Sequence, residues 1–288
     1  MIDRVSYYPG CSLEGTARDY QESVQWVAAT LGLDLEELPD WTCCGASAAH
    51  SLDEKAALAL GARNLGLAQK IGLADLVVPC ALCFNRLKNA DKALAEGRTI
   101  LPGTDSYQAK VKIWDLMDFL SQPEMIERLK TKIIRPLKGL TAVCYYGCQV
   151  ARPPKVTGHK AAENPINMEG LLTVLGAEAR DWSYKTDCCG ASHSFPRRDI
   201  VFTLVGRLYE HALETGAECL VVSCQMCQAN LDMFQPKIAK QLGHEIYLPV
   251  FYFTELIGLA CGAREVSTWL GRHLIDPVPF LKSKGLWD

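Results

Sequence analysis

Short apolar runs alternate with longer amphipathic segments along this chain, and the whole alternation occurs twice. In the first half, runs that fit a strand are separated by segments whose apolar residues recur at the helical period. We expect strand, helix, strand, helix and strand, in that order, over residues 5–8, 17–31, 33–38, 53–71 and 76–78. Ser51 is the expected N-cap of the second helix.

The second half repeats this order, which predicts two fused domains. Its strands and helices are expected over residues 142–145, 168–175, 177–182, 199–213 and 219–222. A period of about 140 residues is too long for a solenoid repeat and fits two domains, 1–138 and 139–288. Because strands alternate with helices, we predict an α/β fold of two pseudo-symmetric Rossmann-like halves, each a small parallel sheet flanked by helices.

Ten of the 13 cysteines fall at matching places in the two halves. Each half has one cysteine after its first strand, a Cys-Cys-Gly sequence after its second and a C-x2-C motif after its third. The two sets are Cys11, Cys43, Cys44, Cys80 and Cys83, and Cys148, Cys188, Cys189, Cys224 and Cys227. All ten are therefore expected in loops at the carboxyl ends of parallel strands, where open α/β sheets bind their ligands.

Three cysteines stand outside this pattern. A Gly-Cys step shared by the two halves selects Cys148 rather than Cys144 for the second set. Cys144, Cys219 and Cys261 lie in apolar segments, where a buried cysteine usually behaves as a small hydrophobic residue. We assign these three no function.

The spacing of the cysteines favours a metal cluster over other uses of thiols. A structural zinc ion takes four protein ligands, and so does a cubane iron-sulfur cluster. Five thiols, two of them from neighbouring cysteines, therefore indicate a larger or more open centre. Gly45 and Gly190 follow the adjacent pairs, where a residue without Cβ permits a positive φ or a close approach to a cluster. A disulfide framework, zinc in one half and a thioredoxin-like dithiol remain alternatives.

Composition and charge limit the classes of partner that the chain is expected to bind. The chain has 288 residues, 49% of them hydrophobic, and a net charge of −3, which gives no general electrostatic reason to bind nucleic acid. The N-terminus does not resemble a secretory signal, and the most apolar late stretch, 250–263, is too short to span a bilayer. We expect a cytoplasmic protein without a membrane span, and a solvated helix face and linker in the basic segment 122–140.

The duplicated five-cysteine pattern resembles the twin CCG domain of the B-type polypeptide of heterodisulfide reductase over nearly the whole chain. The resemblance implies two noncubane [4Fe-4S] clusters, one held by each set of five cysteines. It also implies the reaction of that family, reduction of the mixed disulfide of coenzyme M and coenzyme B in methanogenesis. Two clusters facing each other across a cleft would each supply one of the two electrons that a disulfide requires.

The resemblance also implies electron-transfer partners from the same heterodisulfide reductase complex, namely its ferredoxin-like C-type polypeptide and its flavin-bearing A-type polypeptide. This agrees with the absence from the chain of a closely spaced C-x2-C-x2-C-x3-C ferredoxin motif. Related CCG proteins serve lactate, glycolate and succinate oxidoreductases or sulfur-compound oxidoreductases, so an oxidoreductase of that kind is the alternative enzyme. A non-catalytic electron-transfer or zinc-stabilised module is a further alternative.

Several polar residues close to the cysteine pairs are candidate substrate contacts. His50 and His193 are candidates for proton transfer or substrate binding. Lys55, Arg197 and Arg198 are candidates for binding anionic groups of the substrate. Solvated helix starts are the alternative for these three cations.

Overall fold

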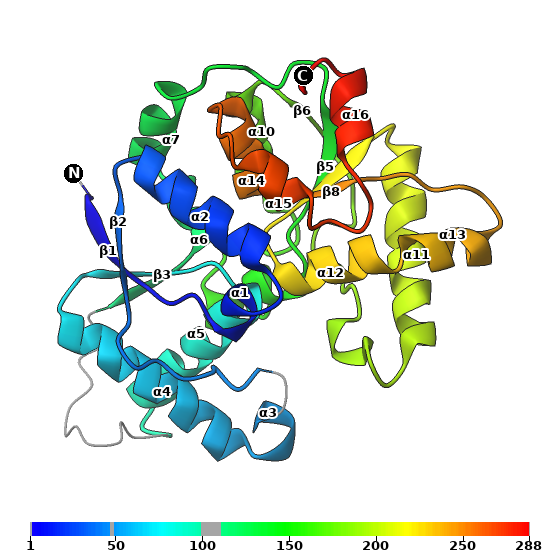
Figure 1. Ribbon diagram of the computed structural model, residues 1–288. Helices are drawn as coiled ribbons and strands as arrows, with labels where there is room; N and C mark the ends of the chain where they lie inside the picture. The colour runs from blue at the N-terminus through cyan, green and yellow to red at the C-terminus, as the bar shows by residue number, and fades with distance from the viewer. Residues whose placement is uncertain (1, 47–48, 99–110, 288) are drawn as a thin grey trace.

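The computed structural model describes residues 2–46, 49–98 and 111–287. It contains two four-stranded sheets, both entirely parallel, with strand orders β2-β1-β3-β4 and β6-β5-β7-β8. The predicted α/β fold of two equivalent halves is confirmed (Figure 1). The strands are β1 (Arg4–Tyr7), β2 (Asp34–Glu37), β3 (Asp75–Val78), β4 (Lys112–Asp115), β5 (Thr141–Tyr145), β6 (Glu178–Arg180), β7 (Cys219–Val222) and β8 (Val250–Tyr252).

Helices connect the strands in the same order in both halves. Those of the first half are α1 (Cys11–Glu14), α2 (Arg18–Thr30), α3 (Ala49–Leu52), α4 (Glu54–Ile71), α5 (Ala81–Ala95), α6 (Leu116–Leu120) and α7 (Pro123–Lys130). Those of the second are α8 (Cys148–Ala151), α9 (Pro154–Thr157), α10 (Asn167–Leu175), the 3-10 turn η1 (Ala191–His193), α11 (Arg198–Glu214), α12 (Gln225–Met233), α13 (Gln235–Leu242), α14 (Phe253–Ala260), α15 (Val266–Leu270) and α16 (Val278–Ser283). The proposed boundary at 138/139 lies between α7 and β5 and stays a prediction.

The central strands form the cores of the two sheets. Leu76, Val77 and Val78 of β3 are fully buried, as is the whole of β7. Strands covered by helices on both faces have continuous apolar sequences, which explains why these segments were identifiable from the sequence. The outer strand β2 is instead acidic and partly exposed, and charge on an outer strand discourages pairing with another chain.

Three sequence-based expectations differ from the structure. Each half has a fourth strand, β4 or β8, which the sequence analysis did not predict. Ser51 is not the N-cap of the long helix: it lies inside α3, and Asp53 caps α4 by accepting hydrogen bonds from two backbone N–H groups. In the basic segment, Arg128 is only 19% exposed because it pairs with Asp3 and Glu124.

The two halves are joined by equivalent helix contacts. In one contact α2 packs against α14 and α15, and in its counterpart α10 packs against α6 and α7. At the first contact the rings of Tyr20 and Tyr252 stack with centroids 4.2 Å apart. The starts of α1, α5 and α12 consequently lie near one another in the middle of Figure 1. These helix starts carry cysteines of both halves.

Candidate metal centres

The topology of each sheet brings its three cysteine segments together. The chain turns to opposite sides after two neighbouring central strands, β1 and β3 in the first half, and leaves a crevice at their carboxyl ends. Cys11 begins α1 at this edge, and Cys80 is the N-cap of α5, its sulfur accepting a hydrogen bond from the Cys83 N–H at 3.3 Å. In the second half, Cys148 and Cys224 have the same positions at α8 and α12.

Each five-cysteine set has a buried side and an open side. In the first, Cys44 and Cys83 are buried with their sulfurs 3.3 Å apart, whereas Cys11 and Cys43 are exposed with sulfurs 3.9 Å apart. The second set repeats this arrangement with buried and exposed thiols. The sulfurs of buried Cys189 and Cys227 are 3.7 Å apart, Cys148 is partly buried and Cys188 is exposed. All 13 cysteines lie in the described part of the chain and carry free thiols.

Glycines let the sulfurs approach the backbone. Gly10 and Gly147, each just before the first cysteine of a set, have φ of 76° and 68°. A Cβ on either would lie 2.8 Å from a sulfur, that of Cys83 or Cys227. Sequence reasoning did not single them out, although the shared Gly-Cys step was the available signal.

The glycines after the cysteine pairs have a positive φ, one of the two possibilities that the sequence left open. Gly45 has a φ of 77° and Gly190 a φ of 78°. Their N–H groups donate to the sulfurs of Cys43 and Cys188 at 3.4 and 3.2 Å. The backbone of each Cys-Cys-Gly turn therefore points hydrogen-bond donors toward thiol sulfur.

Hydrogen bonding among the thiols favours the thiolate form at specific positions. Hydrogen bonding with Cys43 and then with Cys83 lowers the pKa of Cys44 to about 3. Hydrogen bonding with Cys148 lowers the pKa of Cys188 to about 6, and hydrogen bonding with Cys227 lowers the pKa of Cys189. The same hydrogen bonding raises the pKa of the partner thiols Cys43, Cys83, Cys148 and Cys227. The fit of each donor set to an iron-sulfur cluster or zinc therefore rests on its five converging thiols.

Contacts link the two sets across the halves. Gln225, inside the second C-x2-C motif, donates from Nε2 to the Cys80 sulfur of the first set at 2.8 Å. The Tyr20 hydroxyl lies 3.2 Å from the carbonyls of both Pro79 and Ser223, which directly precede the C-x2-C motifs. Sequence reasoning missed both residues. The position of Gln225 within a cysteine motif was the only signal for it, and Tyr20 gave none.

The histidines and cations proposed from the sequence have different surroundings. His193 is exposed in η1, close enough to Cys188 for its charge to favour the thiolate. His50 lines a cavity beside the first set. Lys55 lies in the exposed first turn of α4. Arg197 pairs with Asp199 at 2.8 Å, and Arg198 donates to the Ser194 carbonyl at 3.3 Å. Of these five residues, His193 interacts with a thiol, and a substrate contact by any of the five stays a prediction.

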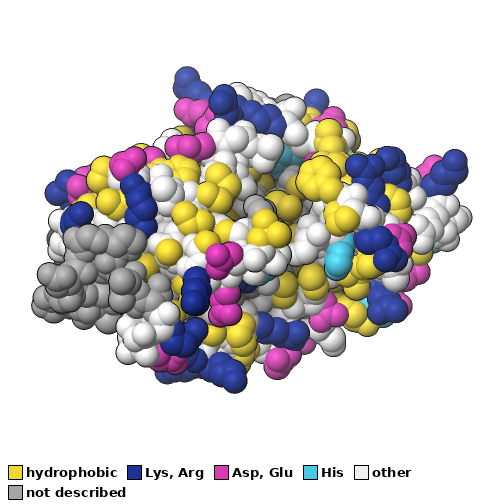
Figure 2. Space-filling model, turned by 90° about the horizontal axis from the view of Figure 1, so that it is seen from below, with side chains coloured by type: hydrophobic (Ala, Val, Ile, Leu, Met, Phe, Trp, Pro, Cys, Tyr) yellow, Lys and Arg dark blue, Asp and Glu magenta, His cyan; other side chains and the backbone are white. Residues whose placement is uncertain are grey.

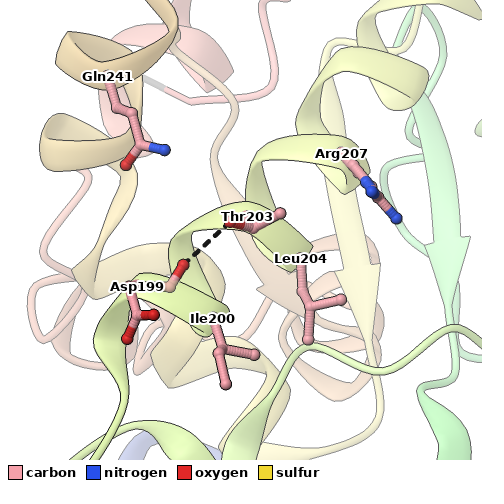
Figure 3. Close-up of a pocket in the computed structure, with 6 residues that line it drawn as sticks. All are labelled: Asp199, Ile200, Thr203, Leu204, Arg207 and Gln241. Carbon is pink, nitrogen blue, oxygen red and sulfur yellow. Dashed lines mark hydrogen bonds between the residues drawn. The ribbon is translucent and has the colours of Figure 1, made fainter.

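Cavity size alone does not locate the site. A cavity of about 350 Å³ lies between α11 and α13, where Figure 3 shows Gln241 across from the helical Asp199, Thr203 and Arg207, and no thiol lines it. A smaller cavity of about 60 Å³ lies at the second cysteine set and is lined by Cys148, Cys188, Cys189, Cys224 and Cys227. Ala81 and Leu82 of the first half also line this smaller cavity. The space beside the second set is therefore shared by both halves.

A doubled α/β fold with five converging thiols at the same edge of each sheet defines a cysteine-rich metal or redox protein. Comparison with protein families gives the family: the cysteine-rich domain model, CCG, matches residues 5–88 and again 142–232. The chain belongs to the CCG cysteine-rich domain family, whose domains are typical of iron-sulfur cluster binding.

Curated relatives extend over almost the whole chain. It is 31% identical over 282 residues to the 8-methylmenaquinol:fumarate reductase membrane anchor subunit of Wolinella succinogenes, covering 96% of this chain and 98% of that one. It is 26% identical to the B-type polypeptide of the ferredoxin/F420H2-dependent CoB-CoM heterodisulfide reductase of Methanosarcina acetivorans, covering 96% of both. The predicted relationship to the B-type polypeptide of heterodisulfide reductase is confirmed.

A solved structure supports the fold. A hypothetical protein from Helicobacter pylori matches with a TM-score of 0.68 at 12% identity, over 95% of this chain and 52% of that chain. This chain therefore spans about half the length of that protein. Within the described ranges, we find no helix with the length and apolar character that crossing a membrane requires.

Proposed function

We propose that this protein is the catalytic iron-sulfur component of a heterodisulfide reductase-type complex. The first set of five cysteines would hold one noncubane [4Fe-4S] cluster and the second set another. The observation that carries the proposal is the pair of complete thiol sets at equivalent sheet edges, joined through Gln225 and Tyr20. A chain that used only one centre would not need ten ligands in matching positions.

The proposed reaction is reduction of a mixed disulfide, such as that of coenzyme M and coenzyme B, to two thiols. It consumes two electrons and two protons, breaks the S–S bond and forms two S–H bonds. When bound, the clusters supply the electrons. The chain's own residues enclose one side of each set and leave Cys11, Cys43 and Cys188 exposed on the other, where substrate can approach. His193 and His50 are the proposed proton donors to the product thiolates.

Electrons must reach this chain from other polypeptides. A ferredoxin protein like the C-type polypeptide of heterodisulfide reductase and, behind it, a flavin protein like the A-type polypeptide are the proposed donors, and the relatives are named as subunits of reductases. Two exposed apolar side chains support docking: Leu52 is 85% and Phe195 87% exposed, each a few residues after a cysteine pair. Figure 2 shows one face where hydrophobic side chains are interspersed with charges of both signs, which suits a protein partner. A cytoplasmic location stays a prediction.

A second function is favoured by the relative from Wolinella succinogenes. Identity of 31% across 96% of the chain supports a role in a quinol:fumarate reductase-type complex. There the two centres would pass electrons between a quinol and a partner protein without binding a disulfide. Other organic-acid or sulfur-compound oxidoreductases belong to the same alternative.

Reoxidation of the reduced protein separates these functions. The protein is purified without oxygen, its iron is confirmed, and it is reduced with dithionite and freed of excess reductant. Mixing with one equivalent of the coenzyme M and coenzyme B disulfide should reoxidise it and release two thiols per disulfide. Reoxidation by a menaquinone analogue alone, with no thiol released, would establish the second function instead.

A further inference from the structure

A cavity of about 190 Å³ lies beside the first cysteine set, between α3, α4 and α5. No thiol lines this cavity, so it is distinct from the cysteine sets described above. Its lining is mostly polar, includes two arginines, and consists of His50, Glu54, Ala57, Leu58, Arg86, Asn89 and Arg98.

Arg86 is the lining residue with a buried side-chain nitrogen that lacks a hydrogen-bond partner among the described residues. It follows Cys83 by one turn of α5, and its guanidinium is close enough to Cys44 to interact with that thiolate electrostatically. Nε is shielded from solvent and has no hydrogen-bond partner among the described residues. Burial lowers the pKa of Arg86, the Cys44 thiolate opposes this, and a guanidinium stays charged throughout. A half-buried guanidinium with an unsatisfied N–H group is costly, so it favours a further hydrogen-bond acceptor, such as an anion, beside it.

Two other polar residues of the lining, Arg98 and Asn89, already have partners. Arg98 pairs with Glu96 at 2.7 Å, which offsets its charge. The Asn89 amide donates to the carbonyl and side-chain oxygens of Asn85 at 2.9 Å. Glu54, in the first turn of α4, is the single acid of the lining.

The second half places a neutral residue at the equivalent position. Three residues after Cys227 stands Asn230, where the first half has Arg86 three residues after Cys83. The Asn230 amide donates to the Cys189 carbonyl at 3.0 Å, and its side-chain oxygen accepts from Ser194 at 2.8 Å. Asn230 is therefore committed to holding its own cysteine loop. In this respect the two otherwise equivalent halves differ.

We propose that the cavity at Arg86 is an oxyanion subsite, in which Arg86 and His50 bind a carboxylate, sulfonate or phosphate group of the substrate. The inference rests on the proposed function and deepens it. A substrate of this subsite would carry an anionic group at one end, and that end would face the first half. A guanidinium pairs with such groups through two parallel hydrogen bonds. The thiol-lined space of the second half receives the other end.

The test compares charged and neutral disulfides on the loaded protein. Binding of dithiodiglycolate, which carries two carboxylates, and of neutral bis(2-hydroxyethyl) disulfide is measured by calorimetry on anaerobic, oxidised protein. We expect Arg86→Gln to weaken dithiodiglycolate about tenfold or more and to leave the neutral disulfide unchanged. Arg86→Lys should recover part of the affinity. Lys88→Gln, which removes a charge from the same helix outside the cavity lining, is the control and should bind like wild type.

Two further arms identify the source of the anion. If Arg86→Gln also weakens fumarate, the subsite serves organic acids, and if it weakens dithiodiglycolate but not fumarate, it serves acidic disulfides. Equal dithiodiglycolate affinity in wild type and Arg86→Gln, at equal iron content, would overturn the subsite. Iron content is measured first, so that a protein without iron refutes the proposed function. Sulfate binding to that same protein still shows whether Arg86 binds oxyanions.

Discussion

At the scale of single residues, the glycine before each set leaves little room between its Cα and a cysteine sulfur of the same set. We predict that Gly10→Ala prevents loading of the first centre, because the new Cβ would lie 2.8 Å from the Cys83 sulfur. Gly72→Ala is the matched control: its φ of 80° imposes similar backbone strain, roughly 1 kcal/mol, with no atom within 4 Å of the new Cβ. Iron per chain should fall by about half in Gly10→Ala only. Full loading of Gly10→Ala would show that this close approach is unimportant.

The assignment of ligands makes a second prediction at this scale. Cys44→Ala and Cys189→Ala should each lose about half of the iron, because each removes a buried thiolate from one set and leaves the other set complete. Cys261→Ala removes a thiol that ends α14 and belongs to neither set, so it should keep all its iron. Iron and protein assays on the three variants decide this. Equal iron in all three would remove both cysteines from the ligand sets.

What the sequence revealed about residues depended on repetition. All ten cysteines could be identified as candidate ligands because the two halves repeat the same spacing. In the structure, the five cysteines of each half lie close together. Gln225, Tyr20 and Arg86 could not be chosen, since their contacts join segments far apart in sequence or depend on what surrounds a helix turn. The sequence did not reveal the surroundings of the charges near each cysteine pair: Arg197, for example, pairs with its neighbour Asp199.

At the scale of secondary structure, a buried ionic cluster fastens α2 of the first half to α14 of the second. His273 Nε2 lies 2.9 Å from Glu255 and 3.9 Å from Asp19, and all three side chains are almost fully buried. Burial alone would lower the pKa of His273, but Glu255 and the nearby Asp232 and Asp19 raise it to about 9. Burial, with a contribution from Glu255, also raises the pKa of Asp19 to about 6.

These shifts predict how stability depends on pH. Because the folded-state pKa of His273 exceeds the unfolded value of about 6.5, its contribution is complete below that pH and is lost as pH rises through 9. We expect the melting temperature to fall by roughly 5–10 °C between pH 7 and 10, corresponding to about 3 kcal/mol. His273→Gln should flatten this dependence, whereas exposed His244→Gln should retain it. A profile unchanged by His273→Gln would contradict the assignment.

The elements themselves were predictable to the extent that their local patterns were strong. The long helix α4 and the buried strands β3 and β7 matched, because length or a continuous apolar run identifies them. The outer strands β4 and β8 were not predicted, and the structure identifies them by their parallel pairing with β3 and β7. Asp53 and Ser51 are both good N-caps, and only the structure shows which one the helix uses.

At the scale of the whole molecule, the duplication produces two similar sites that are not identical. Equivalent helix contacts hold the halves together, and the cysteine edges adjoin through Gln225 and Cys80. Two adjoining redox centres suit a reaction that needs two electrons. The difference between Arg86 and Asn230 gives the pair a direction, since only the first half has a cation at this position, and the Nε of that cation has no hydrogen-bond partner among the described residues.

The central claim is that both five-cysteine sets hold iron-sulfur clusters, and metal analysis tests it most directly. Protein purified under strictly anaerobic conditions is assayed for iron, acid-labile sulfide and zinc. The account predicts about eight irons per chain, with labile sulfide and no stoichiometric zinc, as expected for two four-iron clusters. Zinc without labile sulfide, or iron sufficient for one centre only, would contradict it.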